Sequence, residues 1–265
     1  YPGPSYHHVH MESPIELGII LVVAFVPAII YMLWIRSAEV HEREPFLAVE
    51  GVFIYGLVVA LGMAFVLEVV AMIALRSIGG GMLDPQAGTV LMAVVLAPLI
   101  EEFTKLTGVF TVTRRLTEPE NGLVYGAAVG LGFAAGENVL YYSTAWTEGF
   151  EILVITVIAR TITSTLLHTS ASAISGFGVS RSKCLRTWYG TLSSWSPYYL
   201  AAVAIHAVFN LLASLGSDIF PEAGTEASFI ALLLSVVLVW STVRYIRRKI
   251  IELDRHNVGG QIRCQ

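Results

Sequence analysis

Seven apolar runs, each long enough to cross a lipid bilayer, most strongly limit how this 265-residue chain can fold. They lie at about 14–35, 46–75, 88–113, 121–143, 151–178, 197–215 and 226–246. A bilayer core about 30 Å thick needs roughly 20 apolar residues per helix, and each run meets that length. Only 14% of the residues are charged, against about 25% in soluble domains. We therefore predict an all-α, polytopic transmembrane helix bundle of about seven helices in the cell membrane.

Basic residues gather in alternate loops, and this distribution predicts the orientation of the chain. The loops after the first, third and fifth runs and the C-terminal end hold Arg36, Arg43, Arg114, Arg115, Arg181, Lys183, Arg186, Arg244, Arg247, Arg248, Lys249, Arg255 and Arg263. The opposite loops hold only Arg76, near a helix end. The positive-inside rule therefore predicts an N-terminus outside and a C-terminus in the cytoplasm.

The third run, "LMAVVLAPLIEEFTKLTGVF", contains three charged residues, Glu101, Glu102 and Lys105. A charged side chain at mid-membrane costs at least about 2.5–3.5 kcal/mol, so such residues indicate a functional site. Lys105 follows Glu101 by four positions and Glu102 by three, which lets its ammonium group neutralise part of the acidic charge. The carboxylate that remains can serve as a general acid or base.

Three further runs also contain polar residues. Glu137 lies in the fourth run, His168 in the fifth, and His206 and Asn210 in the sixth. Histidine nitrogens and carboxylate oxygens are ordinary zinc ligands, and the same groups activate water without a metal. Each residue alone also fits a structural role, because intramembrane polar side chains often join helices by hydrogen bonds. Together they favour a site that activates water.

Two other intramembrane charges have no assigned role. Glu68 is an isolated carboxylate in the second run, and Arg160 lies two turns before His168 on roughly the same helical face. The two cysteines, Cys184 and Cys264, both fall near the predicted cytoplasmic side and are expected to be free thiols. No GxSxG motif is present, which argues against a serine nucleophile of that type.

Four short motifs occur in order between about residues 98 and 212. They are EEFTK (Glu101–Lys105), FAAGE (Phe133–Glu137), HTSAS (His168–Ser172) and HAVFN (His206–Asn210). This series resembles the EExxK, FxxxE, HxxxS and HxxxD/N motifs of the PrsW family of membrane-embedded proteases. That family is similar to the CAAX prenyl-protein proteases and, more distantly, to the scaffold subunit of γ-secretase.

The resemblance implies roles for the motif residues. Glu101 or Glu102 would be the general base, and Lys105 would hold the glutamate pair. His168 and His206 would bind a metal, with Glu137 as a further candidate ligand, or would assist as acid and base. The metal expected is Zn²⁺, and a metal-independent glutamate–histidine mechanism is the alternative. In the HAVFN motif, Asn210 would stabilise the oxyanion.

The same resemblance implies an endopeptidase that cuts membrane-anchored proteins, with a substrate similar to an anti-sigma factor. We expect the lipid bilayer as the environment, no nucleic-acid partner, and no particular oligomeric state. The expected organisation is an expression remnant or disordered arm at 1–10, one transmembrane domain at 11–250 with a catalytic core at about 88–215, and a cytoplasmic tail at 251–265. No cleavable signal peptide is expected, because the first run is of full membrane length and lacks a basic leader.

Two other classes of function remain as alternatives. A non-catalytic scaffold would use the same polar residues to hold helices together and position a partner. A proton-coupled transporter or light-driven pump is disfavoured, because Lys249 lies at the end of the last run rather than at mid-membrane, and no inverted repeat is visible.

Overall fold

The computed structural model describes residues 13–41, 43–79, 84–215, 224–256 and 264. Its elements are α1 (Pro14–Arg36), α2 (Phe46–Tyr55), η1 (Gly56–Ala60), α3 (Leu61–Gly79), α4 (Pro85–Leu91), η2 (Met92–Leu96), α5 (Ala97–Thr111), η3 (Thr113–Arg115), α6 (Asn121–Glu148), α7 (Phe150–Ile162), α8 (Ser164–Tyr189), α9 (Ser196–Ser214) and α10 (Gly224–His256). No strand occurs within these residues, so the all-α prediction is confirmed. The arm predicted at 1–10 lies outside the described ranges.

Within the described residues, seven stretches of helix are long and apolar enough to cross a membrane, which confirms the predicted number of spans. The second span joins α2, η1 and α3, and the third joins α4, η2 and α5. Both η1 and η2 are single π-helical turns, which interrupt the regular hydrogen bonding and re-aim the following helix. The orientation of the two termini stays a prediction.

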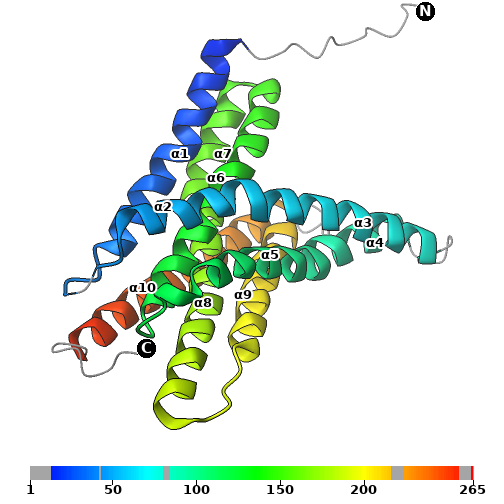
Figure 1. Cartoon of the computed structure of the whole chain (residues 1–265). Helices are drawn as coiled ribbons and strands as arrows, with labels where there is room; N and C mark the ends of the chain where they lie inside the picture. Colours follow the sequence, from blue (N-terminus) through cyan, green and yellow to red (C-terminus); the bar gives the residue numbers. More distant parts are fainter. Residues whose placement is uncertain (1–12, 42, 80–83, 216–223, 257–263, 265) are drawn as a thin grey trace, which may run out of the picture.

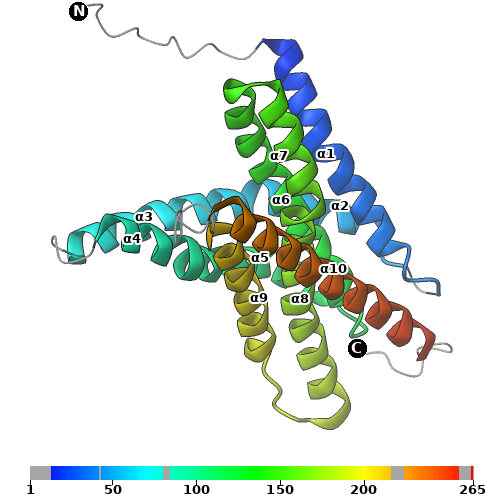
Figure 2. The ribbon, with the colours of Figure 1, turned by 180° about the vertical axis from the view of Figure 1, so that it is seen from behind.

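Helix α6 lies at the centre of the bundle (Figures 1 and 2). In its most apolar stretch 83% of the residues are buried within the protein, so it faces other helices rather than lipid. Gly122, Gly126 and Gly130 follow one another at four-residue intervals along its contact with α8. A Cβ atom on any of them would collide with a backbone carbonyl of α8, so glycine is what permits this close approach.

The second span crosses α6 steeply, as Figure 1 shows. The crossing is made by two glycines, because a Cβ on Gly132 would collide with the carbonyl of Phe53 and one on Gly56 with the carbonyl of Val129. One turn beyond this crossing α6 presents Glu137. The glycines thus bring the second span close to the polar residues of α6.

The fifth span is bent, although its sequence predicts one continuous helix. Thr163 leaves the helical conformation at φ −120° and ψ −80°, which separates α7 from α8. Its hydroxyl donates to the carbonyl of Ala159 over 2.7 Å, and so caps the end of α7. The break places His168 in the second turn of the new helix.

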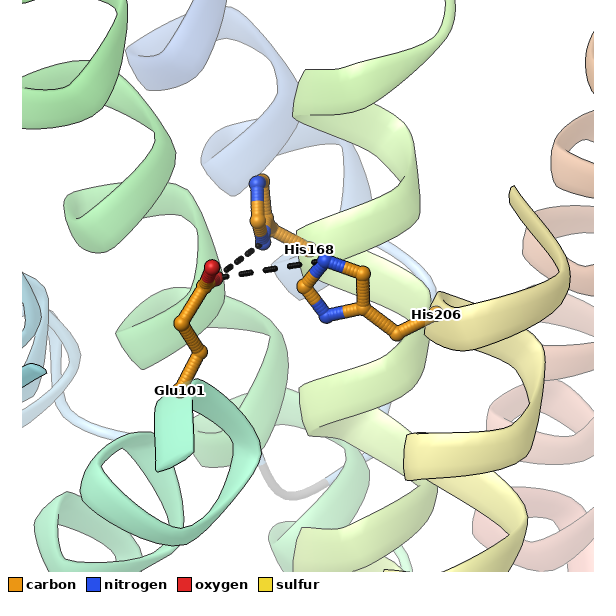
Figure 3. Close-up of side chains that lie close together, drawn as sticks. All are labelled: Glu101, His168 and His206. Carbon is orange, nitrogen blue, oxygen red and sulfur yellow. Dashed lines mark ion pairs between the residues drawn. The ribbon is translucent and has the colours of Figure 1, made fainter. Parts of the chain in front are cut away.

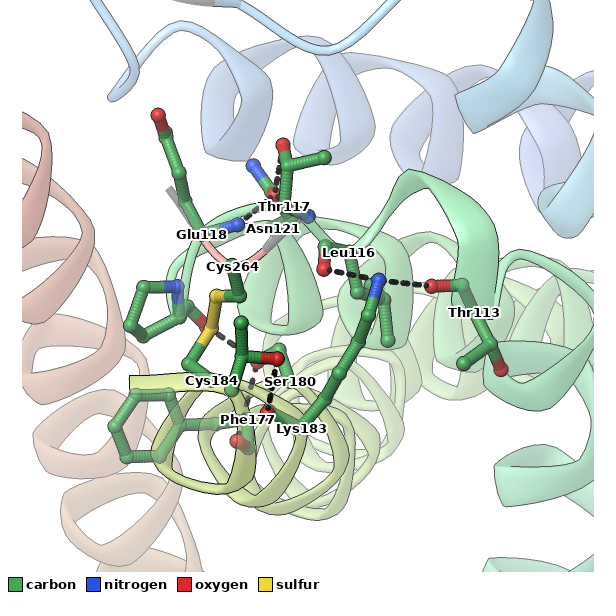
Figure 4. Close-up of a disulfide and its surroundings, with 12 residues drawn as sticks. Thr113, Leu116, Thr117, Glu118, Asn121, Phe177, Ser180, Lys183, Cys184 and Cys264 are labelled. Atoms are coloured by element: carbon green, nitrogen blue, oxygen red, sulfur yellow. Dashed lines mark hydrogen bonds between the residues drawn. A yellow bond between two sulfur atoms is a disulfide. The ribbon is translucent and has the colours of Figure 1, made fainter. Parts of the chain in front are cut away.

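Cys184 and Cys264 form a disulfide, so the prediction of free thiols is wrong (Figure 4). Both cysteines are fully buried, and the backbone nitrogen of Cys264 donates to the carbonyl oxygen of Thr117 over 2.6 Å. The two residues are 80 positions apart, and α10, which precedes Cys264 in the sequence, packs against α8. That long-range contact could not be derived from cysteine spacing.

Candidate active site

Helix α5 contributes three charged residues that are buried inside the bundle. Lys105 Nζ lies 2.7 Å from Glu102 Oε1 and 3.4 Å from Glu101 Oε2, and the lysine side chain is fully buried. The ammonium group also lies 4.4 Å from the centre of the Phe133 ring on α6. A buried ammonium is stabilised only if such partners surround it. Lys105 therefore fixes the two glutamates relative to each other and to α6.

Two histidines from different helices converge on Glu101 (Figure 3). Its Oε2 atom lies 3.8 Å from His168 Nδ1 on α8 and 3.9 Å from His206 Nε2 on α9. One ligand atom from each of the three residues lies within 4.8 Å of the other two, and all three residues are buried. The structure thus brings together residues that are 38 to 105 positions apart in the sequence.

Each histidine is oriented by a second carboxylate. Glu102 Oε1 lies 2.8 Å from His206 Nδ1, and Glu137 Oε2 lies 3.0 Å from His168 Nε2. We assign the ring protons to these nitrogens, since an ionised carboxylate only accepts hydrogen bonds. The other two nitrogens, which are the ones nearest Glu101, are then unprotonated. Such carboxylate–histidine pairs are typical of metal-binding histidines.

Lys105 also contacts this group, because its Nζ lies 2.9 Å from His168 Nδ1. That nitrogen accepts a hydrogen bond from the ammonium, in agreement with the assigned tautomer. A metal ion bound to Nδ1 would have to displace this hydrogen bond. Lys105 therefore influences both the charge of the glutamates and the access of a cation to His168.

The sequence did not reveal the role of Arg160 on α7. Its Nη2 lies 2.6 Å from Glu137 Oε2, and its Nε donates to Asn138 Oδ1 over 2.7 Å. The guanidinium also lies over the Tyr141 ring, 3.7 Å from its centre. An unpaired arginine inside a membrane span is energetically costly, so the position of Arg160 in an apolar run already indicated that it has partners. Arg160 holds Glu137 against His168.

Asn210 and Glu137 occupy places beside the three converging residues. Asn210 Nδ2 donates to the carbonyl of Ala93 in η2 over 2.8 Å, which leaves its second amide hydrogen for another acceptor. Glu137 lies behind His168, so Glu101 is the carboxylate of the three-residue group.

A cavity of about 500 Å³ gives access to the site. Its lining includes Glu101, His168, His206, Asn210 and Arg160. Glu102 and Lys105 are not among the lining residues and are completely buried. Because each water molecule takes about 30 Å³, a polar space of this size holds several, so water can reach Glu101.

Comparison with known proteins agrees with this geometry. The sequence model of a family described as PrsW family intramembrane metalloprotease matches residues 44–242. The chain belongs to the PrsW family. It is 29% identical over 192 residues to Protease PrsW of Geobacillus kaustophilus, an alignment that covers 70% of this chain and 76% of that protein. It is 23% identical over 228 residues to Protease PrsW of Clostridioides difficile, with 83% and 87% covered. No solved structure matches the chain.

Membership in the PrsW family makes this chain a multi-pass membrane protease, which confirms the resemblance read from the four motifs. The family is described as a metalloprotease family, so the side chains at the site can be tested for their fit to a metal ion. One carboxylate oxygen and two histidine nitrogens form a set found in catalytic zinc sites. Glu101, His168 and His206 supply these atoms close together, and they fit.

Proposed function

We propose that this protein hydrolyses peptide bonds of membrane-anchored proteins at the site formed by Glu101, His168 and His206. The observation that carries the proposal is the convergence of His168 Nδ1 and His206 Nε2 on Glu101 Oε2 beside a polar cavity inside a membrane bundle. The catalytic core would comprise about residues 88–215 of a single transmembrane domain. In keeping with the family resemblance, we propose an anti-sigma-factor-like protein as the first substrate to test.

The two adjacent glutamates receive different roles. Glu101 lines the cavity, whereas Glu102 is fully buried and contacts Lys105 Nζ and His206 Nδ1. Ser172 of the HTSAS motif also lies 3.5 Å from Glu102. We therefore assign the reacting carboxylate to Glu101 and a positioning role to Glu102.

A zinc ion would be held by Glu101, His168 and His206. When bound, it would supply Lewis-acid chemistry, that is, acidification of water and polarisation of the scissile carbonyl. The contact between Lys105 and His168 Nδ1 would open on binding. Glu102 and Glu137 would keep the two imidazole rings in the required tautomers.

The protein's own groups account for the proton movements of hydrolysis. A water oxygen attacks the scissile carbonyl carbon while Glu101 Oε1, the oxygen that does not face the two histidines, accepts a water proton. The second amide hydrogen of Asn210 is available to the developing oxyanion. The proton then passes to the leaving amine nitrogen as the carbon–nitrogen bond breaks. In a metal-independent mechanism the same transfers would need only Glu101 and the two histidines.

Purified protein and a single-pass model substrate in liposomes would test the proposal. We expect Glu101→Gln and His206→Ala to lower the cleavage rate roughly 100-fold or more, as loss of an acid–base group does. Glu148→Gln and His41→Ala are matched controls, because both side chains are exposed and away from the cavity.

Metal content separates the two mechanisms. About one zinc per chain, lost together with cleavage in His206→Ala, would support the metalloprotease. Cleavage by metal-free protein would support the glutamate–histidine mechanism. Absence of cleavage from every substrate, with variants that are merely less stable, would contradict the proposal and favour a scaffold.

A further inference from the structure

A second cavity, of about 510 Å³, lies on another side of Glu101. It is bounded by the second span, α5 and α6, and most of its lining is apolar. The apolar residues include Leu57, Val58, Leu61, Phe65, Phe133 and Leu140. Its volume falls within the range of about 300–1,000 Å³ that is usual for ligand pockets.

The two cavities have a common wall. Glu68, Glu101, Glu137 and Tyr141 line both of them. The reacting carboxylate assigned above therefore lies between a polar space, where water can enter, and an apolar space. A peptide bond placed at Glu101 would have room for a neighbouring side chain in the apolar space.

The rim of the apolar cavity faces the lipid. Val58, Phe65 and Leu140 are 62%, 63% and 58% exposed, and they lie in membrane-spanning segments. Exposed apolar side chains in such segments contact acyl chains rather than water. The cavity is thus reached from the membrane, which is the direction from which a membrane-anchored substrate arrives.

Glu68 distinguishes a peptide from a lipid as the occupant. This half-buried carboxyl group forms no hydrogen bond or ion pair with the residues that the structure describes. An acyl chain has no donor for a carboxyl oxygen, whereas an extended peptide presents backbone N–H groups. The acidic wall at Glu68, Glu101 and Glu137 therefore favours a peptide whose apolar side chain fills the cavity.

We propose that this cavity is a specificity subsite that receives a large apolar side chain, of the size of Leu or Phe, from the substrate residue beside the scissile bond. The inference rests on the proposed protease site at Glu101. It predicts that the enzyme selects its cleavage position by the size of this side chain. Shape and apolar burial in such a pocket typically discriminate 10- to 200-fold per methylene lost.

Gly62 offers a way to fill the subsite without disturbing the backbone. It lines the cavity, and a Cβ atom built on it meets nothing within 4 Å. Phenylalanine has a higher helix propensity than glycine, so the substitution Gly62→Phe should not weaken α3. Gly51 lies in the same span, also meets nothing within 4 Å, and lines neither cavity.

The experiment compares wild type, Gly62→Phe and the control Gly51→Phe on substrates with Phe or Ala on either side of the scissile bond. Wild type and Gly51→Phe should cleave the Phe substrate with a kcat/KM roughly 10-fold or more above that of the Ala substrate. Gly62→Phe should lose that preference, so that its kcat/KM for the Phe substrate falls to about its value for the Ala substrate. An unchanged preference in Gly62→Phe would overturn the subsite. If that variant also loses co-purifying phospholipid, the cavity is a lipid site instead.

Crosslinking tests the subsite independently of turnover. A substrate peptide with a photoreactive phenylalanine analogue should label the segment 57–68 of Glu101→Gln, and Gly62→Phe should abolish that label. If wild type cleaves nothing but the label appears, the proposed hydrolysis fails and the binding subsite stands. If cleavage occurs and the label falls elsewhere, the subsite fails and the protease stands.

Discussion

Replacing Glu102 by Gln should destabilise the protein far more than replacing Glu101 by Gln, although the two residues are neighbours. Glu102 is fully buried, its Oε1 lies 2.7 Å from Lys105 Nζ, and it also lies 2.8 Å from His206 Nδ1. Removing one partner of a buried ion pair costs about 3–5 kcal/mol, because the other charge is left uncompensated. Glutamine keeps one acceptor oxygen, so we expect a loss of about 3 kcal/mol, at the lower end.

Glu101 forms a longer ion pair with Lys105 than Glu102 does, and it is more accessible to water. Its Oε2 lies 3.4 Å from Lys105 Nζ, and its side chain borders both cavities. Glu101→Gln should therefore cost roughly 1 kcal/mol, the net value of an ordinary hydrogen bond. Both variants should lose hydrolysis, but Glu101→Gln should lose it with the fold intact, whereas Glu102→Gln should lose it together with stability.

A double-mutant cycle with Lys105→Met supplies the control. Glu102→Gln with Lys105→Met has the same net charge as wild type and should recover more than half of the stability lost in Glu102→Gln alone. Unfolding in detergent, followed by tryptophan fluorescence, measures all four species. Equal destabilisation by Glu101→Gln and Glu102→Gln, or additive effects in the cycle, would refute the division of roles between the two glutamates.

Three further substitutions test separate parts of the structure. His206→Ala should reduce bound zinc from about one ion per chain toward none, as measured by elemental analysis, because a ligand nitrogen is lost. Gly130→Ala should abolish cleavage and lower the melting temperature, since its Cβ would collide with the carbonyl of His168, whereas Gly62→Ala should do neither. Burial raises the pKa of Glu39, in the loop after α1, to about 8. The stabilisation of the fold by protonated Glu39 is complete below about pH 4.5 and is lost as the pH rises through about 8. Glu39→Gln should therefore reduce the change of melting temperature with pH between pH 5 and 9.

The spans and the polar cluster could be predicted because each is a local property of the sequence. Hydropathy over about 20 residues identifies a membrane helix whatever its neighbours are. Each motif lies within one membrane span and can be recognised there by itself, so only the convergence of the four motifs had to be inferred. The structure confirms the seven spans and brings Glu101, His168 and His206 within reach of one another.

Contacts that depend on tertiary packing could not be derived in this way. Arg160, which pairs with Glu137, lies three residues before the bend at Thr163, and no glycine or proline marks that bend. The disulfide between Cys184 and Cys264 joins residues 80 positions apart and so depends on tertiary packing, such as that of α10 against α8. This bond also bears on orientation, since disulfides are rare in a reducing cytoplasm, where the basic residues of α10 are predicted to lie.

The division of roles between Glu101 and Glu102 shows why sequence stops short of mechanism. Adjacent residues on an α-helix point about 100° apart, so two neighbouring carboxylates reach different surroundings. Which of them enters depends on the rotation of α5, and this rotation is fixed by contacts from other helices, namely His206 of α9 with Glu102 and Phe133 of α6 with Lys105. Glu102 contacts both Lys105 and His206 and neutralises the buried ammonium group. Glu101 can therefore still line the cavity. Under the proposed mechanism, Glu102 thus allows Glu101 to remain a reacting group inside a membrane bundle, and removing Glu102 should disable the site by disorder rather than by loss of a base.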